Sequence, residues 1–598
     1  MPLLPGRAKL FLSIYMTATI VLSLFDVAAM GLLALVITPV ATGAPIAIPG
    51  FGEYPIESAP WLILVACAFI IVKSVLAVAM HAIAVRQFAF YEFELGARLL
   101  RAYLASSWEE RAKRTTVEFT RVVDTGVSMS VSSLILQLVT VPGNILTIVL
   151  TMGVIVVAQP VTALITIVYL AIVAVIINVL VARRSLDTAN TNLKASQRVA
   201  VLLTEIVDSL KELTLRGRLD HVQGVVGAQR QHAVKARARL SLLNVIPRYA
   251  YEIALIGGFL IVGGSAYILG DMTTAVVAVA LFGAAGVRLI PALTGIQNSL
   301  INANVSVPWV RDVIDGLRGA EANPTDALAG EDATALPDSP RTLDLSDIHF
   351  RYPSSTAPVL NGLSVEVPLG SSLGVVGPTG SGKSTLIDIL LGLRTPTSGS
   401  LTIDGTPLTD VIHAWRSRIG YVPQRVTLFN GTIGQNVALT WEDDYDRDKV
   451  MEVLGKAQLL ELLDTRQGGL DERLGERGMS LSGGQQQRLG IARALYSDPL
   501  MLVLDEATSS LDTKTEDDVV NALKALHGEV TLIAVAHRIS TIKDYDQICY
   551  LDAGRILGKG TFTELAASVP QFNLQVQLAG LGEREEVPVG SASPPPPL

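Results

Sequence analysis

Long apolar runs dominate the first three hundred residues of the chain. Six stretches of this part are rich in Leu, Ile, Val and Ala and are nearly free of charged residues. A helix needs about 20 consecutive apolar residues to cross the hydrocarbon core of a bilayer. We therefore predict six transmembrane helices, at residues 10–38, 60–84, 131–157, 161–182, 250–269 and 273–300.

The polar connections between these stretches predict the orientation. Segment 85–128 holds seven Lys or Arg and segment 183–248 holds twelve, whereas the opposite connections, 41–59, 158–160 and 270–272, hold none. Basic residues concentrate in cytoplasmic loops. We therefore expect the long connections, both termini and the C-terminal region to be cytoplasmic. The first apolar stretch is longer than a signal-peptide core, which predicts a retained span.

The two basic segments are helical in pattern, so spans two to five are expected to continue beyond the bilayer. Their turns, predicted near Thr116–Asp124 and Leu213–Val225, would touch a cytoplasmic domain. The alternative is that these segments are plain solvated loops. The outer loop 41–58 is rich in Gly and Pro but carries several apolar residues. This composition predicts a position at the outer membrane interface, while its prolines make a regular helix doubtful.

The pattern changes after residue 317. Residues 318–341 are rich in Gly, Ala, Asp and Pro, which predicts a linker between a transmembrane domain, 1–317, and a second domain, 342–575. Short β-like runs, such as TLDLSDIHF and LMLVLDEA, alternate with helical ones in that domain. This alternation predicts an α/β fold with a largely parallel sheet. The Pro-rich tail, 576–598, is predicted to be disordered.

Composition narrows the class of protein. Of 598 residues, 50% are hydrophobic and 17% are charged, which is too apolar for an ordinary soluble enzyme of this size. The net charge of −8 argues against a nucleic-acid partner, which needs a basic surface. The two cysteines, Cys67 and Cys549, lie in different regions, so no disulfide framework or cysteine metal site is predicted.

One string predicts a nucleotide site. GPTGSGKST at 377–385 matches G-x-x-x-x-G-K-[ST], a loop whose backbone N–H groups surround phosphates, and it lies between a strand pattern and a helix pattern. Its glycines allow a tight turn, Lys383 supplies positive charge, and Ser384 is expected to reach Mg²⁺. The predicted nucleotide-binding residues of this loop are Gly377, Thr379, Gly380, Ser381, Gly382, Lys383, Ser384 and Thr385.

A second buried-strand pattern, LMLVLDEA at 500–507, ends in two carboxylates. Asp505 is expected to join the Mg²⁺ shell, and Glu506 to polarise the attacking water. An apolar run that ends in Asp-Glu is common by chance. The phosphate loop in the same domain is what favours the catalytic interpretation here.

Further strings occur in a fixed order: FRYP at 350–353, YVPQ at 421–424, LSGGQ at 481–485, SSLD at 509–512 and VAHR at 535–538. With them, residues 342–575 resemble the nucleotide-binding domain of an ATP-binding cassette (ABC) transporter. The resemblance implies that Tyr352 stacks on adenine, that Gln424 senses Mg²⁺ and the attacking water, and that His537 contacts the γ-phosphate. It also implies that Asp512 lies at the subunit contact and that a γ-phosphate is bound by the signature residues Ser482, Gly483, Gly484 and Gln485, which follow Leu481.

In that family the LSGGQ string of one cassette completes the ATP site of a partner cassette. One cassette and six spans therefore resemble a half-transporter, for which we expect a homodimer with two hydrolysis-competent sites. GERG at 475–478 resembles a short loop of exporters, in which Glu476 would meet the cytoplasmic helix tips. Importers that use binding proteins usually lack it, so export is the predicted direction.

Three charged residues fall near mid-bilayer depth: Asp26, Lys73 and Arg288. Such residues are costly to bury and are candidates for function. Arg288 and Lys73 are the predicted substrate residues, because two copies of Arg288 in a dimer suit an anionic headgroup such as pyrophosphate. Arg288 shares a helix face with a stripe that suits a cavity wall: Ala292, Gly295, Ser299 and Asn302. The alternatives are a structural Asp26–Lys73 ion pair, and Arg288 bonded to a backbone carbonyl at a kink beside Pro291.

RLIPALTGIQNSLINAN at 288–304 and, more loosely, KELTLRGR at 211–218 resemble the bacterial flippase of lipid-linked oligosaccharides. A lipid-linked oligosaccharide in a bacterial cytoplasmic membrane is therefore the leading substrate hypothesis. A multidrug or lipid A/phospholipid-type exporter shares the layout. A peptide exporter is disfavoured because no peptidase-like domain is seen before the first span. A non-transporting ATPase that gates a channel or signals also remains open.

Overall fold

The computed structural model describes residues 6–581 except 43–44, 49–51, 159, 270, 323–334, 354, 476–480, 508–512 and 537. The side chains of a few helical residues, Asp26 among them, also lie outside this description. The chain divides into two compact units, residues 1–325 and 326–598, and each is described by itself.

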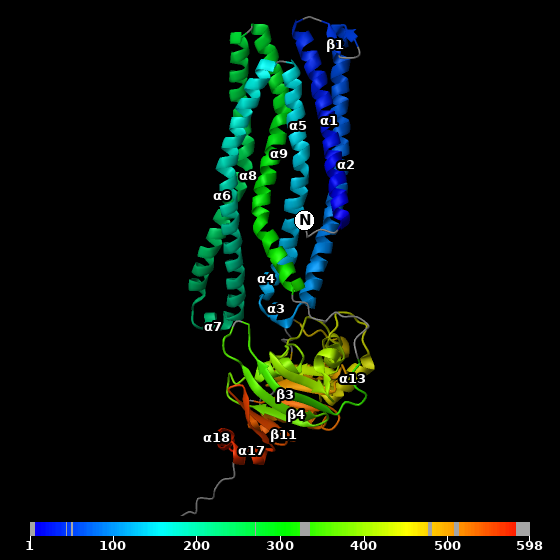
Figure 1. Cartoon of the computed structure of the whole chain (residues 1–598), viewed down its shortest axis with the longest axis vertical. Helices are drawn as coiled ribbons and strands as arrows, with labels where there is room; N and C mark the ends of the chain where they lie inside the picture. The colour runs from blue at the N-terminus through cyan, green and yellow to red at the C-terminus, as the bar shows by residue number, and fades with distance from the viewer. Residues whose placement is uncertain are drawn as a thin grey trace, which may run out of the picture. The chain divides into compact units, whose positions relative to one another are not determined.

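The first unit is helical, and within its described residues six helices are long and apolar enough to cross a membrane. Four of them are 47–51 residues long, which corresponds to about 70–75 Å at 1.5 Å per residue. That is more than twice the roughly 30 Å of a bilayer core. The predicted extensions are therefore confirmed for spans two, four and five, and span six is extended as well. The third span is part of a continuous helical stretch of 42 residues, Thr116–Val157. The main helices (Figure 1) are α1 Gly6–Thr42, α2 Ala59–Ala105, α5 Leu136–Ala158, α6 Pro160–Asp208, α8 Leu219–Leu269 and α9 Met272–Ala322.

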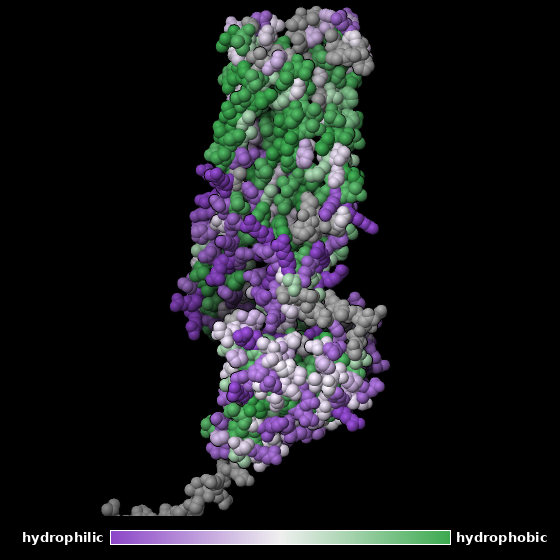
Figure 2. Space-filling model, viewed as in Figure 1, coloured by the Kyte–Doolittle hydropathy of each residue, from purple (hydrophilic) through white to green (hydrophobic). Residues whose placement is uncertain are grey.

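The surface of this unit separates into an apolar and a polar part. On the face in Figure 2, hydrophobic residues form a broad band over the part of the helices nearest the outer loop, and hydrophilic residues gather around α7 (Leu210–Leu215). Many large apolar side chains of this unit are exposed, Ile71 and Val78 of α2 among them. Exposed apolar surface of this extent is expected of helices that face lipid.

One of the two turns between the long helices differs from the prediction. The first lies around residues 106–115, beside α3 (Trp108–Ala112), because Ser107 and Thr115 cap helices there. Residues 116–124, predicted as the turn, are instead helical in α4 (Thr116–Arg121) and in a π-helical segment, Val122–Gly126. A second π-helical segment, Met129–Ile135, follows before α5. The other turn lies between α6 and α8, where Gly217 has a φ of +59°.

The outer loop forms a β-hairpin that the sequence pattern did not predict. Strand β1 (Ile46–Ile48) pairs antiparallel with β2 (Gly52–Tyr54). Ile46 is fully buried against Val36 of α1 and Ala59 of α2. Part of the apolar surface of this loop is therefore buried within the protein.

Ion pairs connect the C-terminal end of α9 to the C-terminal part of α2 and to α4. Arg98 binds Glu321 at 2.6 Å, and Arg121 binds Asp312 at 3.0 Å. The Arg121 guanidinium also lies 4.9 Å from the centre of the Trp309 ring. These contacts hold the last turns of α9, the helix that leads toward the second unit in the sequence. Because α9 continues to Ala322, the first residues of the predicted linker are helical.

The second unit contains the predicted parallel sheet. Its six strands have the order β12-β11-β5-β10-β9-β8, and only the β11–β12 pair is antiparallel. Strands β5, β9 and β10 are almost wholly buried, which explains their continuous apolar runs. The bounds are β5 Ser372–Val376, β8 Ile419–Val422, β9 Met501–Asp505, β10 Thr531–Val535, β11 Gln547–Asp552 and β12 Arg555–Gly560.

A second, antiparallel sheet has the order β4-β3-β6-β7. Its strands are β3 Thr342–Phe350, β4 Leu360–Pro368, β6 Ser398–Ile403 and β7 Thr406–Pro407. The main helices of the unit are α10 Lys383–Leu390, α13 Arg447–Lys456, α15 Gly483–Leu495, α16 Thr513–Lys524 and α18 Pro570–Leu578. Cys549 is buried in β11, where burial raises the pKa of its thiol to about 12, and neither cysteine forms a disulfide.

Candidate functional site

The phosphate loop connects β5 to α10, as the sequence pattern predicts. Strand β5 lies between β11 and β10, so the loop starts from the middle of the sheet. Gly382 caps α10 with a φ of +106°, and a Cβ there would lie 2.8 Å from the Leu360 side chain. Only glycine suits both constraints. The loop is therefore fixed in a tight turn at the N-terminus of α10.

Lys383 is the cation of this loop and is only 7% exposed. Its Nζ donates to the carbonyl oxygens of Gly377 at 2.8 Å and Pro378 at 2.9 Å. Burial lowers the pKa of Lys383, while the charges of Glu506 and Asp505 oppose that shift. The lysine is therefore held by the loop itself, close to two carboxylates. A bound phosphate would offer its Nζ stronger acceptors than these carbonyls.

The other loop residues divide into exposed and buried ones. Thr379, Gly380 and Ser384 are exposed, whereas Ser381 and Thr385 are buried. The Ser381 hydroxyl oxygen has no hydrogen-bond partner among the described residues. A buried polar atom without a partner is costly, and a ligand that bonds to it removes the cost.

The predicted metal ligand Asp505 and the predicted catalytic base Glu506 follow each other at the end of β9. The backbone N–H of Glu506 bonds to the Val535 carbonyl of the neighbouring strand β10, and Glu506 has a φ of +52°. A positive φ is unusual outside glycine and is a form of strain found at functional sites. The hydrogen bond to β10 holds the Glu506 backbone in this conformation directly after Asp505.

Gln424 and Glu506 lie together, as the family resemblance implies. The Gln424 Nε2 donates to Glu506 Oε2 at 2.6 Å, although the residues are 82 positions apart. Gln424 is exposed and follows β8, whereas Glu506 follows β9. The parallel β8–β9 pairing brings these two strand ends to one edge of the sheet.

Asp505 is half-buried beside them. Burial raises the pKa of its carboxyl; the Tyr421 hydroxyl and Lys383 oppose the shift, whereas Glu506 adds to it. The Tyr421 hydroxyl donates to Asp505 Oδ2 at 3.3 Å. Burial and Asp505 raise the pKa of Tyr421 to about 12, so it remains a donor at neutral pH. Sequence reasoning missed Tyr421, because nothing in YVPQ marks its first residue as a partner of Asp505.

The donor atoms of this site suit Mg²⁺. The candidates are the Ser384 hydroxyl, the Asp505 carboxylate and the Gln424 side-chain oxygen, and Mg²⁺ prefers oxygen ligands of these kinds. Among the described residues no cluster of three or more His, Cys, Asp or Glu could hold a metal by itself. Such a site fits a magnesium ion that arrives with nucleotide phosphates.

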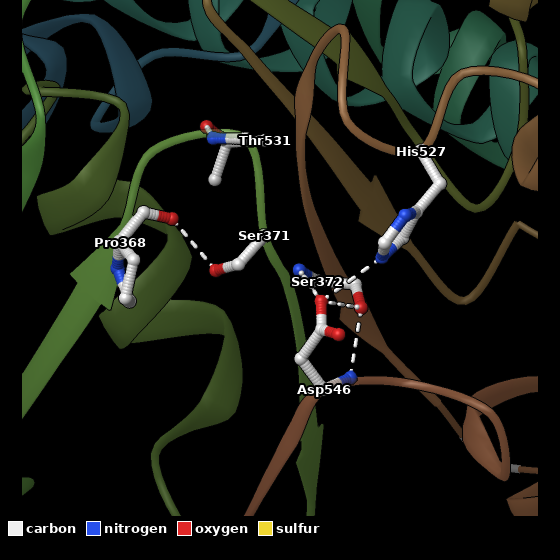
Figure 3. A network of polar contacts seen from close by, with 7 residues as sticks. Pro368, Ser371, Ser372, His527, Thr531 and Asp546 are labelled. Carbon is white, nitrogen blue, oxygen red and sulfur yellow. Dashed lines mark hydrogen bonds and ion pairs between the residues drawn. The ribbon is translucent and has the colours of Figure 1, made fainter.

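The start of strand β5 is held by a separate polar network, drawn in Figure 3. One Asp546 oxygen, Oδ2, accepts from the Ser372 N–H and hydroxyl, both at 2.8 Å, and lies 3.0 Å from His527 Nε2. Burial opposes the shift, but these hydrogen bonds and His527 lower the pKa of Asp546. The network fixes the end of β5 opposite the phosphate loop.

The signature residues begin helix α15. Ser482 caps the helix: its Oγ accepts from the Gln485 N–H at 3.3 Å, and its own N–H donates to the Gln485 side chain at 3.0 Å. Gly483 is exposed and Gly484 is buried. Within the described part of the chain, the hydrogen bonds of Ser482 and Gln485 stay in their own helix, and none reaches the phosphate loop.

Comparison with known proteins agrees with this geometry. Residues 360–509 match the family model described as ABC transporter. The chain is 42% identical over 224 residues to the ATP-dependent lipid A-core flippase of Cupriavidus pinatubonensis, covering 37% of this chain and 38% of that protein. It is 36% identical over 296 residues to a multidrug resistance ABC transporter ATP-binding and permease protein of Lactococcus lactis, covering 48% and 50%. The chain thus spans less than two thirds of the length of these relatives.

The fold comparison covers nearly the whole chain. A bacterial Atm1-family ABC exporter, solved with ATP bound, superposes with a TM-score of 0.75 at 23% identity, over 96% of this chain and 99% of that chain. The chain has the fold of an exporter-type ABC half-transporter. This fold confirms the predicted combination of a six-helix membrane unit and an α/β nucleotide-binding unit.

Three residues predicted from the resemblance, His537, Asp512 and Glu476, lie outside the described residues. Their roles therefore stay predictions. A neighbour of His537 is described: Arg538 forms an ion pair with Glu516, which is largely buried in α16.

The first, helical unit contains the predicted substrate residues. Lys73 lies in α2 and Arg288 in α9, and both are half-buried. Asp26 lies in α1, but its side chain is outside the description, so the Asp26–Lys73 pair stays a prediction.

The stripe below Arg288 is packed rather than open. Ala292 and Ser299 are buried, and the Ser299 hydroxyl donates to the Gln137 carbonyl oxygen of α5 at 3.1 Å. Gly295 lies against Asn144 of α5, because a Cβ there would be 2.7 Å from its Nδ2. The sequence interpretation of this stripe as a cavity wall is corrected for these residues, which form a helix–helix contact.

Proposed function

We propose that this half-transporter binds and hydrolyses Mg²⁺-ATP as a homodimer and uses the energy to move an amphipathic anionic lipid out of the cytoplasmic leaflet of a bacterial inner membrane. The observation that carries the proposal is the Gln424–Glu506 contact of 2.6 Å beside Asp505 and the phosphate loop. It brings a carboxylate base and a water-orienting amide to one place, in a chain that also has six candidate spans.

Each residue of the ATP site has a defined part in this proposal. Lys383 and the loop N–H groups bind the phosphates, and Ser384 with Asp505 would hold Mg²⁺, which neutralises charge on the phosphates when it is bound. Glu506 accepts a proton from the attacking water, and Gln424 keeps the carboxylate and the water aligned. Tyr421 holds Asp505 in its half-buried position through the 3.3 Å hydrogen bond.

The homodimer is proposed because, among the described residues, no hydrogen bond joins Ser482 or Gln485 to the phosphate loop of their own chain. Helix α15 has 13 residues, and Ser482 and Gly483 at its start are exposed. A helix N-terminus with free N–H groups suits a phosphate. A second chain that faces the first would bring its Ser482 to the γ-phosphate bound at Lys383, and the reciprocal site would form at the same time.

A complementation experiment tests this arrangement. A chain with Lys383→Ala is co-expressed with a chain with Ser482→Arg, the two carry different tags, and the mixed dimer is purified by both tags. If signatures act across the dimer, one of the two sites is intact and the mixed dimer hydrolyses ATP, although neither parent does. A mixed dimer that is as inactive as both parents would mean that the signature acts within its own chain, or that the proposed dimer is wrong.

The substrate proposal rests on the membrane half. Arg288 and Lys73 are half-buried at membrane depth, and a paired set of cations from two chains suits a diphosphate headgroup. We favour a lipid-linked oligosaccharide. The names of the relatives, a lipid A-core flippase and a multidrug transporter, fit the alternative of a lipid A, phospholipid or drug exporter equally well.

Reconstitution in liposomes separates these substrates. ATP-dependent movement is measured for a fluorescent polyprenyl-diphosphate sugar, a labelled phospholipid and a hydrophobic dye, in wild type and in Arg288→Ala. We expect movement of the diphosphate lipid, reduced by the substitution. Movement of only the phospholipid or the dye, unaffected by Arg288→Ala, would replace the substrate class while leaving the ATPase proposal intact.

A further inference from the structure

Tyr352, the residue predicted to stack on adenine, lies beside an arginine that belongs to none of the sequence motifs. Arg394 follows helix α10, and its side chain is only 9% exposed. Its Nε donates to Asp388 Oδ2 of that helix at 2.8 Å. A largely buried arginine side chain that is hydrogen-bonded to a carboxylate has few alternative rotamers, so the position of its guanidinium is well defined.

The Arg394 guanidinium covers one face of an aromatic pair. Its central carbon lies 4.8 Å from the centre of the Tyr352 ring and 5.7 Å from the centre of the Phe350 ring. The two rings meet edge to face, with centres 5.1 Å apart and an angle of 88° between their planes. These are the distances of cation–π and aromatic contacts. One face of Tyr352 is therefore occupied by a cation.

Two further contacts fix the tyrosine. Its hydroxyl lies 3.1 Å from the Thr385 hydroxyl, which is buried in α10. The loop of Arg394 is joined to the strand that precedes Tyr352, because the Thr397 N–H donates to the His349 carbonyl oxygen at 2.7 Å. Helix α10 therefore contacts Tyr352 at two points, through the Thr385 hydroxyl and through Arg394 held by Asp388. The same helix begins at Lys383.

We propose that Arg394 is a positioning residue for the nucleotide base, holding the Tyr352 ring so that a purine stacks on the face that the guanidinium leaves open. This inference rests on the proposed function, in which Tyr352 stacks on adenine. A ring fixed before binding loses little freedom when the base arrives, which strengthens binding. A cation behind the ring also draws electron density from it, and an electron-poor ring stacks better on an electron-rich purine.

The inference predicts a change in nucleotide affinity without a change in chemistry. Arg394→Met keeps an unbranched stem but removes the charge and the planar group. The loss of one partly buried cation–π contact should raise the KM for ATP about 3- to 10-fold and leave kcat within about twofold of wild type. Arg394→Lys keeps a cation without the planar fork and should give a smaller rise.

Two comparisons show whether Arg394 acts through Tyr352. In a Tyr352→Ala background, Arg394→Met should add less than about twofold to the KM, because the ring on which it acts is gone. Inhibition of ATP hydrolysis by tripolyphosphate, which has no base, should be equally strong in wild type and in Arg394→Met. A purely structural role of Arg394 would instead weaken ATP and tripolyphosphate together.

The effect of the freed carboxylate is controlled separately. Asp388→Asn with Arg394 retained removes the anchor but leaves the guanidinium, and should raise the KM less than Arg394→Met does. If Arg394→Met lowers kcat, and the double variant with Asp388→Asn restores it, the uncompensated Asp388 charge is the cause and the inference is wrong. This pair also answers the question if Arg394→Met alone does not fold.

Failure of the inference differs from failure of the proposed function. If the wild-type protein neither binds nor hydrolyses ATP, the proposed function is wrong. If the wild type hydrolyses ATP and Arg394→Met leaves the KM unchanged, only the role of Arg394 is wrong. Equal effects of Arg394→Met with and without Tyr352 would also overturn it.

Discussion

The phosphate loop passes unusually close to the neighbouring strand at Gly377, and Gly377→Ala tests that closeness. A Cβ at this position would lie 1.9 Å from the Leu551 carbonyl oxygen and 3.0 Å from its carbonyl carbon. The Ser381 Oγ would also be 3.0 Å away. Atoms in ordinary contact are about 3.5–4 Å apart, so the overlap is well over 1 Å.

The structure has little room to relieve this overlap. Leu551 is fully buried in β11, whose neighbouring residue Tyr550 pairs with Val376 immediately before the loop. Moving the Leu551 carbonyl would disturb both that parallel pairing and the antiparallel pairing of β11 with β12. Overpacking of a well-packed interior costs about 1–3 kcal/mol, and a backbone clash lies at the upper end. We therefore expect a loss of about 3 kcal/mol in the free energy of unfolding of this unit.

Gly380→Ala is the matched control in the same loop. Gly380 also has a positive φ, +84°, but no atom lies within 4 Å of its Cβ position. Its substitution carries only the conformational cost of about 1–2 kcal/mol. Thermal unfolding of the purified full chain, with and without ATP, measures both variants. A loss of about 3 kcal/mol corresponds to a midpoint about 6–12 °C lower for a domain of this size.

The relative unfolding temperatures of the two variants test whether the loop lies this close to Leu551. Gly377→Ala should unfold at a lower temperature than Gly380→Ala and should also lose ATP-dependent stabilisation. A Gly377→Ala protein that unfolds within about 2 °C of wild type, or above Gly380→Ala, would show that the loop does not pass this close to Leu551.

Three other predictions concern charged residues. Glu506→Gln should lower kcat about 10²- to 10⁴-fold with ATP binding retained, as measured by steady-state hydrolysis and nucleotide trapping, and near-normal turnover would remove Glu506 from the catalytic role. Burial raises the pKa of Asp505 in the folded protein, so its destabilising effect is present at neutral pH and disappears as the pH falls below the ordinary pKa of aspartate. Asp505→Asn should therefore raise the unfolding midpoint at pH 7.5 while abolishing hydrolysis, and a gain that grows on acidification would contradict the assigned shift. Arg121→Ala removes a side chain that is 16% exposed and should cost about 1–3 kcal/mol, whereas Lys113→Ala removes one that is 66% exposed and should cost under about 0.5 kcal/mol. Equal thermal shifts would contradict this difference.

The sequence predicted the nucleotide-binding unit well because its signals are local. Strands β5, β9 and β10 are buried on both faces and therefore appear as short apolar runs. The phosphate loop carries its own glycines at the positions that need positive φ, such as Gly382. The spans were equally clear, because a bilayer requires a long apolar run whatever the neighbouring helices are.

The membrane unit shows what a one-dimensional pattern leaves out. Ser299 looked like part of a polar cavity wall, since helical spacing places it on the face of Arg288. In the structure it bonds to a carbonyl of α5, a partner 162 residues away in the chain. The pattern gives the face of a helix but not which neighbour covers it. The β1–β2 hairpin was missed for a related reason, because its three-residue strands are too short to show an alternation.

The ATP site combines groups that each destabilise the folded unit and whose charges can offset one another only in part. Burial raises the pKa of Asp505 and lowers that of Lys383, so burial disfavours the charged form of each side chain. Their mutual attraction offsets this cost incompletely, because Lys383 is turned toward the Gly377 and Pro378 carbonyls. A nucleoside triphosphate with its metal ion would place an anion beside the lysine and a cation beside the carboxylate. Binding should therefore stabilise this unit more than its contact area alone predicts, and replacing either residue by a neutral one of similar shape should weaken that stabilisation while making the unliganded protein more stable.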